Sequence, residues 1–225
     1  MSLKFKRLLF LLAWLIIIFS GPISVIRNSD IDSVVSDPVI LTNFFQRLTG
    51  LLAFSILFVQ IVLGSWMNNW IQIIGARAYK LHITQGLIAY GFVLIHPIFQ
   101  NAIIYQTSRS LSEALLVFVP SLNTQRDILL VFGRSAFILA TIAVVAAYFR
   151  TKPFFRRNWK AFHILNYLVF YLVLIHSRIG TDIKSPPFSW IYWTAAIVVT
   201  VSIGHRLFSP FFRKLAQPAI IKQQK

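Results

Sequence analysis

The chain has 225 residues, of which 57% are hydrophobic and only 12% are charged, and its mean hydropathy is +0.70. A soluble domain carries about twice that share of charged residues, so the composition excludes an ordinary soluble enzyme and a disordered chain. The absence of cysteine from the sequence excludes disulfides, thiolate metal sites and iron–sulfur clusters. The formal net charge is +16. The basic residues that produce it lie mostly between apolar segments, so the charge indicates membrane topology rather than nucleic-acid binding.

Apolar segments of membrane-spanning length follow one another along the chain. The predicted spans cover about residues 8–26, 44–66, 81–105, 128–149, 160–177 and 189–207. Each is close to the ~20 residues that a helix needs to cross the hydrocarbon core, and no alternating pattern supports a barrel. The sequence therefore predicts an all-α membrane protein, a six-transmembrane-helix bundle.

The charged residues are divided between two sets of connections. Fifteen basic residues precede the first and third spans, separate the fourth from the fifth, or follow the sixth, and no acid lies among them. All six acids fall in the other three connections. The positive-inside rule then predicts a multi-pass protein of the cytoplasmic (plasma) membrane, with both termini in the cytoplasm.

Four of the five histidines fall within two of the predicted spans, His82 and His96 in the third and His163 and His176 in the fifth, and His205 lies at the inner end of the sixth. An ionisable residue at membrane depth is costly and indicates function, although a neutral histidine can also bond a neighbouring helix. The spacings of 14 and 13 positions each correspond to about 20 Å along a helix. Because both spans run in the same direction, His82 lies level with His163, and His96 lies level with His176.

Two imidazoles on facing helices suit the two axial positions of a haem iron. Histidines ~20 Å apart cannot share one ion, whose ligands all lie within about 2 Å of the metal. We therefore expect two stacked haems and electron transfer. The 13-position spacing leaves its two histidines about 140° apart around a straight helix, so the fifth span needs a bend, a π-bulge or an approach to the haem from its flank.

These residues resemble the ferric reductase-like transmembrane domain, the haem-binding membrane part of ferric reductases, NADPH oxidases and bacterial MsrQ/YedZ-type proteins. The resemblance covers about residues 40–207 and is carried by His82 with His96, the sequence WKAFH at 159–163, and His163 with His176. It implies two b-type haems, the inner one held by His82 and His163 and the outer one by His96 and His176.

The resemblance also implies outward electron transfer and redox partners. About 18 residues follow position 207, too few for the flavin and nicotinamide domain of ferric reductases, so the chain resembles the stand-alone MsrQ type. The expected donor is a cytoplasmic flavin reductase, with FAD or FMN present only through that partner, or membrane quinol, and a quinone is a possible bound cofactor. The expected acceptor is ferric iron or an outer-face protein. Gln100 replaces a histidine of the oxidase branch, which disfavours a superoxide-producing site.

Two arginines lie a turn or two inside the outer ends of their spans, Arg47 in the second and Arg134 in the fourth. Pairing with outer haem propionates is one interpretation, and snorkelling to headgroups is the other. A small proton-coupled transporter or channel that uses intramembrane His and Arg is the alternative function. A haem-free assembly subunit is a third reading, which the four depth-matched histidines disfavour.

The chain divides into three expected regions. Residues 1–40 form the first transmembrane helix and an outer loop, 41–207 the ferric reductase-like haem-binding domain, and 208–225 a basic cytoplasmic tail. The first segment has the basic start of a signal peptide. A retained helix is favoured, because no A-x-A-like cleavage site follows and apolar character continues to Ile26.

Overall fold

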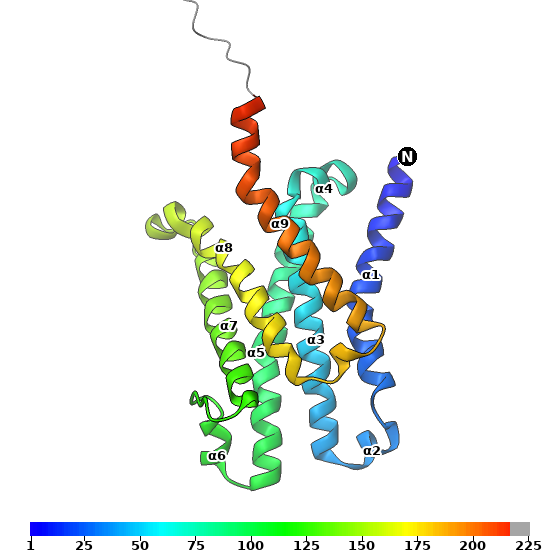
Figure 1. The fold of residues 1–225 in the computed structure, drawn as a ribbon, viewed down its shortest axis with the longest axis vertical. Coiled ribbons are helices and arrows are strands. Elements are labelled where there is room, and N and C mark those ends of the chain that lie inside the picture. Colours follow the sequence, from blue (N-terminus) through cyan, green and yellow to red (C-terminus); the bar gives the residue numbers. More distant parts are fainter. Residues whose placement is uncertain (217–225) are drawn as a thin grey trace, which may run out of the picture.

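The computed structural model describes residues 1–216 and consists of helices joined by short connections (Figure 1). The six long helices are α1 (Leu3–Arg27), α3 (Pro38–Ser65), α5 (Arg77–Ser108), α7 (Gln125–Tyr148), α8 (Pro153–His176) and α9 (Phe188–Ala216). The short elements are α2 (Ile31–Ser36), α4 (Met67–Ile74), α6 (Leu111–Leu116) and the 3₁₀ turns η1 (Ser177–Ile179) and η2 (Asp182–Lys184).

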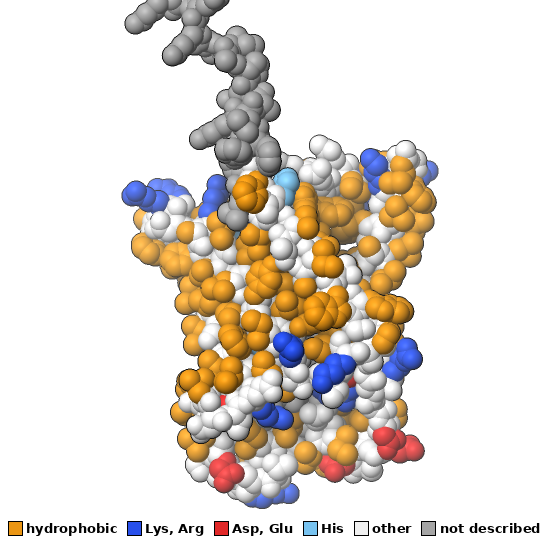
Figure 2. All heavy atoms as spheres, viewed as in Figure 1, with side chains coloured by type: hydrophobic (Ala, Val, Ile, Leu, Met, Phe, Trp, Pro, Cys, Tyr) orange, Lys and Arg blue, Asp and Glu red, His pale blue; other side chains and the backbone are white. Residues whose placement is uncertain are grey.

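Six helices in the described chain are long and apolar enough to cross a membrane, which confirms the predicted multi-span, all-helical class. The N-terminus and the far end of α9 lie at the same end of the bundle (Figure 1). A hydrophobic band runs between the two ends, and the acidic side chains visible in this view lie away from the N-terminus (Figure 2). The arrangement is that of an integral, multi-pass membrane protein.

Local sequence signals explain where the helices begin. Asp37 caps α3 by accepting hydrogen bonds from the backbone N–H groups of Val39 and Ile40, and Pro38 occupies the first turn. Thr124 and Asp127 form a capping box at the start of α7. Each cap satisfies N–H groups that have no partner inside the helix.

Several helices extend beyond the hydrophobic spans predicted from the sequence. α8 begins at Pro153, seven residues before the expected start, because proline's fixed φ suits the first helical position. α5 runs from Arg77 to Ser108, so mostly polar residues extend it at both ends, and α9 continues to Ala216. The expected tail, 208–225, thus includes the end of α9, and residues 217–225 lie outside the described part of the chain.

The centre of the bundle is α3, the most buried of the long helices (Figure 1). Its Phe54 is surrounded by aromatic rings, with Phe170 of α8 at 5.6 Å and Phe188 and Tyr192 of α9 at 5.5 and 5.8 Å between ring centres. α5 packs against α3, and α7 packs against α8, whereas the backbones of α5 and α8 stand apart. The histidine-bearing helices are therefore each supported by a different neighbour.

Candidate functional site

The four intramembrane histidines form two facing pairs between α5 and α8. The ring centres of His82 and His163 lie 5.9 Å apart, with an angle of 77° between the ring planes. Those of His96 and His176 lie 6.2 Å apart, at 83°. The pairing by depth predicted from the spacing is therefore confirmed. Each pair joins α5 to α8, and the two pairs lie at different depths in the bundle.

The distance within each pair fits two imidazoles that share one metal ion. Metal–imidazole bonds of about 2 Å, with each nitrogen about 1 Å from its ring centre, put two opposed ring centres roughly 6 Å apart. Within residues 1–216, no three His, Asp or Glu side chains gather into a site that could hold a metal ion. Two protein ligands per level suit a haem, because its porphyrin supplies the other ligands to iron.

The outer pair is held by backbone carbonyl groups. Nδ1 of His96 lies 2.9 Å from the carbonyl oxygen of Gln46 in α3, and Nδ1 of His176 lies 2.9 Å from that of Leu129 in α7. A carbonyl oxygen only accepts hydrogen bonds, so each Nδ1 must carry the proton and donate it. Nε2 then keeps its lone pair, and this neutral tautomer of histidine is the one that can bind a metal through Nε2.

A glycine lies beside each outer histidine, four positions after the carbonyl that the histidine bonds. A Cβ on Gly50 would lie 2.9 Å from Cε1 of His96, and one on Gly133 would lie 2.6 Å from Nδ1 of His176. Both distances are under 3.0 Å, and real Cβ atoms essentially never lie so close to an atom of another side chain. The two imidazoles therefore reach their carbonyls only because these turns of α3 and α7 carry no side chain.

Sequence reasoning missed these glycines, although their spacing carries a signal. Gly64 follows Gly50 by 14 positions, the separation of His82 and His96, and its Cβ would stand 3.5 Å from Cε1 of His82. α3 thus offers a glycine at both histidine levels of α5. Ala146, fully buried, follows Gly133 by 13 positions, the separation of the two histidines on α8.

The inner pair has weaker hydrogen-bond support. Nδ1 of His82 is buried and has no hydrogen-bond partner among the described residues. The Asn166 amide donates to the carbonyl oxygen of His163 at 2.9 Å and lies 3.4 Å from its Nδ1. Gln85, three positions after His82, accepts a 3.4 Å hydrogen bond from Gln60 of α3 and so links two helices. The inner imidazoles are therefore less firmly oriented than the outer ones.

The 13-position spacing on α8 is accommodated without a π-bulge. α8 is assigned as α-helix throughout Pro153–His176, and His176 is its last residue before the 3₁₀ turn η1. Of the three expected ways to accommodate this spacing, a bend of α8 and an approach to the haem from the flank of the helix therefore remain. Leu129 and Gly133 of α7 lie against the ring of His176, so contacts from a neighbouring helix set its direction.

The two arginines predicted to meet haem propionates differ in their surroundings. Arg134 follows Gly133, which abuts His176, and its Nη1 is buried without a hydrogen-bond partner in the described chain. An acidic group from a ligand would satisfy this donor. Arg134 therefore fits the predicted role beside the outer pair.

Arg47 is bound to a protein carboxylate. Its Nε and Nη2 donate to the two oxygens of Asp182, at 2.7 and 2.5 Å, and its Nη1 donates to Ser29 at 3.1 Å. Asp182 is 2% exposed and also accepts a bond from Asn28. A propionate would have to replace Asp182, so the haem-binding role of Arg47 stays a prediction, whereas its link between α3 and η2 is seen directly.

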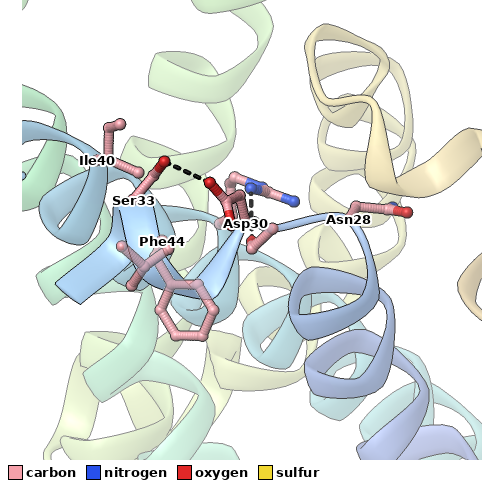
Figure 3. Close-up of a pocket in the computed structure, with 8 residues that line it drawn as sticks. Asn28, Asp30, Ser33, Ile40 and Phe44 are labelled. Atoms are coloured by element: carbon pink, nitrogen blue, oxygen red, sulfur yellow. Dashed lines mark hydrogen bonds between the residues drawn. The ribbon is translucent and has the colours of Figure 1, made fainter. Parts of the chain in front are cut away.

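A small pocket of about 250 Å³ lies beside this ion pair and is lined by residues of the α1–α2 connection, α2 and α3. Figure 3 shows the Ser33 hydroxyl pointing to the Asp30 carboxylate, to which it donates at 2.5 Å, with Phe44 on the α3 side. The pocket residues include none of the four histidines. It is therefore separate from the paired imidazoles.

Comparison of the chain with protein-family models, curated proteins and solved structures finds no match. The resemblance to ferric reductase-like domains accordingly stays a prediction from the residues named above.

Proposed function

We propose that this protein transfers electrons across a membrane through two b-type haems, the inner held by His82 and His163 and the outer by His96 and His176. The observation that supports this most strongly is the pair of ring-centre distances, 5.9 and 6.2 Å, at two levels between the same two helices. Each bound haem would supply an iron that takes up and releases one electron.

The chain's own residues supply ligation, orientation and a medium of low polarity. The carbonyls of Gln46 and Leu129 hold the protons of the outer imidazoles on Nδ1, which would leave the lone pair of each Nε2 available to bind iron. Arg134 provides a cation beside the outer level. Aromatic residues of α3, α8 and α9 pack together in an apolar cluster that supports α8.

The orientation in the proposal has both termini in the cytoplasm of a cytoplasmic (plasma) membrane. It rests on the segregation of basic and acidic connections. Electrons would enter from a cytoplasmic flavin reductase or from quinol and leave to ferric iron or an outer-face protein. These partners come from the resemblance to the MsrQ type and to ferric reductases.

Vesicles reconstituted with the haem-loaded protein test the function. Ferricyanide is enclosed, dithionite is added outside, and the loss of ferricyanide absorbance is followed. We expect reduction well above that of protein-free vesicles, and a return to the protein-free rate for the double variant H82A/H96A. A rate no higher than that of protein-free vesicles, with haem bound and protein inserted, would contradict transmembrane transfer.

A further inference from the structure

A groove of about 510 Å³ lies between α1 and α5 at the end of the bundle that holds the N-terminus. Its volume is within the ~300–1,000 Å³ typical of ligand pockets. Two helix faces line it, with the end of α4 between them. The residues that line the groove are Arg7, Phe10 and Leu11 of α1, Ile74 of α4, and Arg77, Lys80, Leu81 and Thr84 of α5.

Those residues are arranged at helical spacing. Positions 7, 10 and 11 share one face of α1, and positions 77, 80, 81 and 84 share one face of α5. α1 packs against α3, α4 and α9, whereas it makes little backbone contact with α5. Side chains of the two helices thus face each other across a gap that helix packing does not close.

The charge in the groove has one sign. Three of its eight lining residues are basic and none is acidic. Arg7 is held in place because its Nε donates to the carbonyl oxygen of Ile73 at 2.8 Å. The one ion pair found among the described residues joins Arg47 to Asp182, so Arg7, Arg77 and Lys80 have no acidic partner there. These cations are available to an external anion.

Apolar side chains line the groove one turn deeper than its two arginines. Phe10 and Leu11 on α1 and Leu81 on α5 lie one turn deeper than Arg7 and Arg77. Phe10 is braced by Trp70 of α4, with 5.2 Å between ring centres. A ligand that matches both parts has an anionic head and a hydrocarbon chain. Basic pockets between transmembrane helices on the cytoplasmic side bind lipids of this kind.

We infer that this groove binds one anionic phospholipid, with its phosphate between Arg7, Arg77 and Lys80 and an acyl chain along Phe10, Leu11 and Leu81. The bound lipid fills the gap between α1 and α5 and fastens α1 to the start of the helix that carries His82. This site is independent of haem, so its test reads out lipid rather than electron transfer.

Native mass spectrometry of the full chain in detergent, titrated with dioleoylphosphatidylglycerol, measures the binding. The groove variant is R7Q/R77Q/K80Q. The matched control, R150Q/K152Q/R156Q, removes the same charge from the turn between α7 and α8 and the start of α8, outside the groove. We expect the groove variant to bind the lipid about tenfold or more weakly, and the control to bind it as the native chain does.

A second variant, Leu11→Trp, fills the groove without removing charge, and it should also weaken binding while the helical content by circular dichroism is unchanged. Dioleoylphosphatidylcholine should bind much more weakly, and glycerol 3-phosphate should not compete. Equal binding by the groove and control variants would overturn the proposal, as would equal binding of the two lipids. Competition by glycerol 3-phosphate would assign the site to free phosphate, and displacement of the lipid by menaquinone would assign it to a quinone.

Discussion

Gly133 lies so close to His176 that a Cβ added to it would stand 2.6 Å from Nδ1 of the imidazole. The same nitrogen bonds the carbonyl oxygen of Leu129, one turn earlier on α7. The missing side chain and the carbonyl together define where the ring sits. Gly50 and Gln46 do the same for His96 on the other side of the outer level.

The first prediction is that Gly133→Ala displaces His176 and lowers outer-haem content. Alanine stabilises a helix by up to about 1 kcal/mol relative to glycine, so α7 itself is not weakened and the loss is local. Haem per chain and the absorbance spectrum of the purified variant measure the effect. Gly91→Ala is the matched control, because a Cβ there meets nothing within 4 Å. Equal haem content in the two variants would show that the glycine contact is unimportant.

The second prediction separates the two levels. His96→Ala or His176→Ala should remove the outer haem and leave some inner haem, whereas His82→Ala or His163→Ala should remove the inner one. The reason is that no histidine serves both levels. Haem content and low-temperature spectra of the four folded variants provide the test. The same loss of both haems from all four would rule out two independent sites.

The third prediction concerns Arg134, whose Nη1 is buried and unpartnered in the described chain. Removing its charge by Arg134→Gln should make the outer haem harder to reduce, because a nearby cation favours the reduced iron. The expected change in midpoint potential is tens of millivolts, as for a unit charge roughly 10 Å away in a medium of ε ≈ 20. Redox titration measures it. Arg178→Gln, at an exposed position, is the control, and equal shifts in both variants would refute a specific role.

The fourth prediction is that the ion pair between Arg47 and Asp182 stabilises the fold. Arg47→Gln and Asp182→Asn should each destabilise the protein, by about 3 kcal/mol, because each leaves a charged partner without its counterion in a largely buried place. SDS-titration unfolding gives the free energies, and the double variant should cost less than the sum of the two. If Arg47→Gln lowered outer-haem content while Asp182→Asn did not, Arg47 would be a propionate partner after all.

The fifth prediction tests orientation, and the absence of native cysteine makes the labelling clean. Ser112→Cys, in α6, should react with an impermeant maleimide on intact cells. Thr151→Cys, in the turn before α8, should react only after the membrane is opened. Both positions are exposed. The reverse pattern would place the termini outside.

Hydropathy and helical rise could predict the six spans and the pairing of the histidines, because both depend on position along an axis alone. They could not predict the partners of the rings. Asp182 lies 135 positions from Arg47, so no local pattern connects the two, and the sequence offers only propionate pairing or snorkelling as interpretations of Arg47. The glycines beside His96 and His176 act through close helix packing. The 14-position spacing from Gly50 to Gly64 on α3 could have indicated the glycine beside His96, and it says nothing of Gly133 on α7.

The ends of the helices show a further limit of hydropathy. α4 and the first turns of α5 and α8 are polar or amphipathic, so a search for apolar runs passes over them. α8 begins instead at a proline, Pro153, and the end of α4 is tied to α1 by the hydrogen bond from Arg7 to the carbonyl oxygen of Ile73. The lipid groove lies in this region, which explains why the linear pattern alone gave no sign of it.

The central claim, that the two histidine pairs each hold a haem, is tested most directly by a dithionite-reduced minus oxidised absorbance spectrum, with haem quantified per chain. The protein should be expressed with ample haem and purified intact. The account predicts a low-spin b-type spectrum and two haems per chain. A folded protein that binds no haem would contradict it, and one that binds a single haem would show that one of the histidine pairs is not a ligand pair.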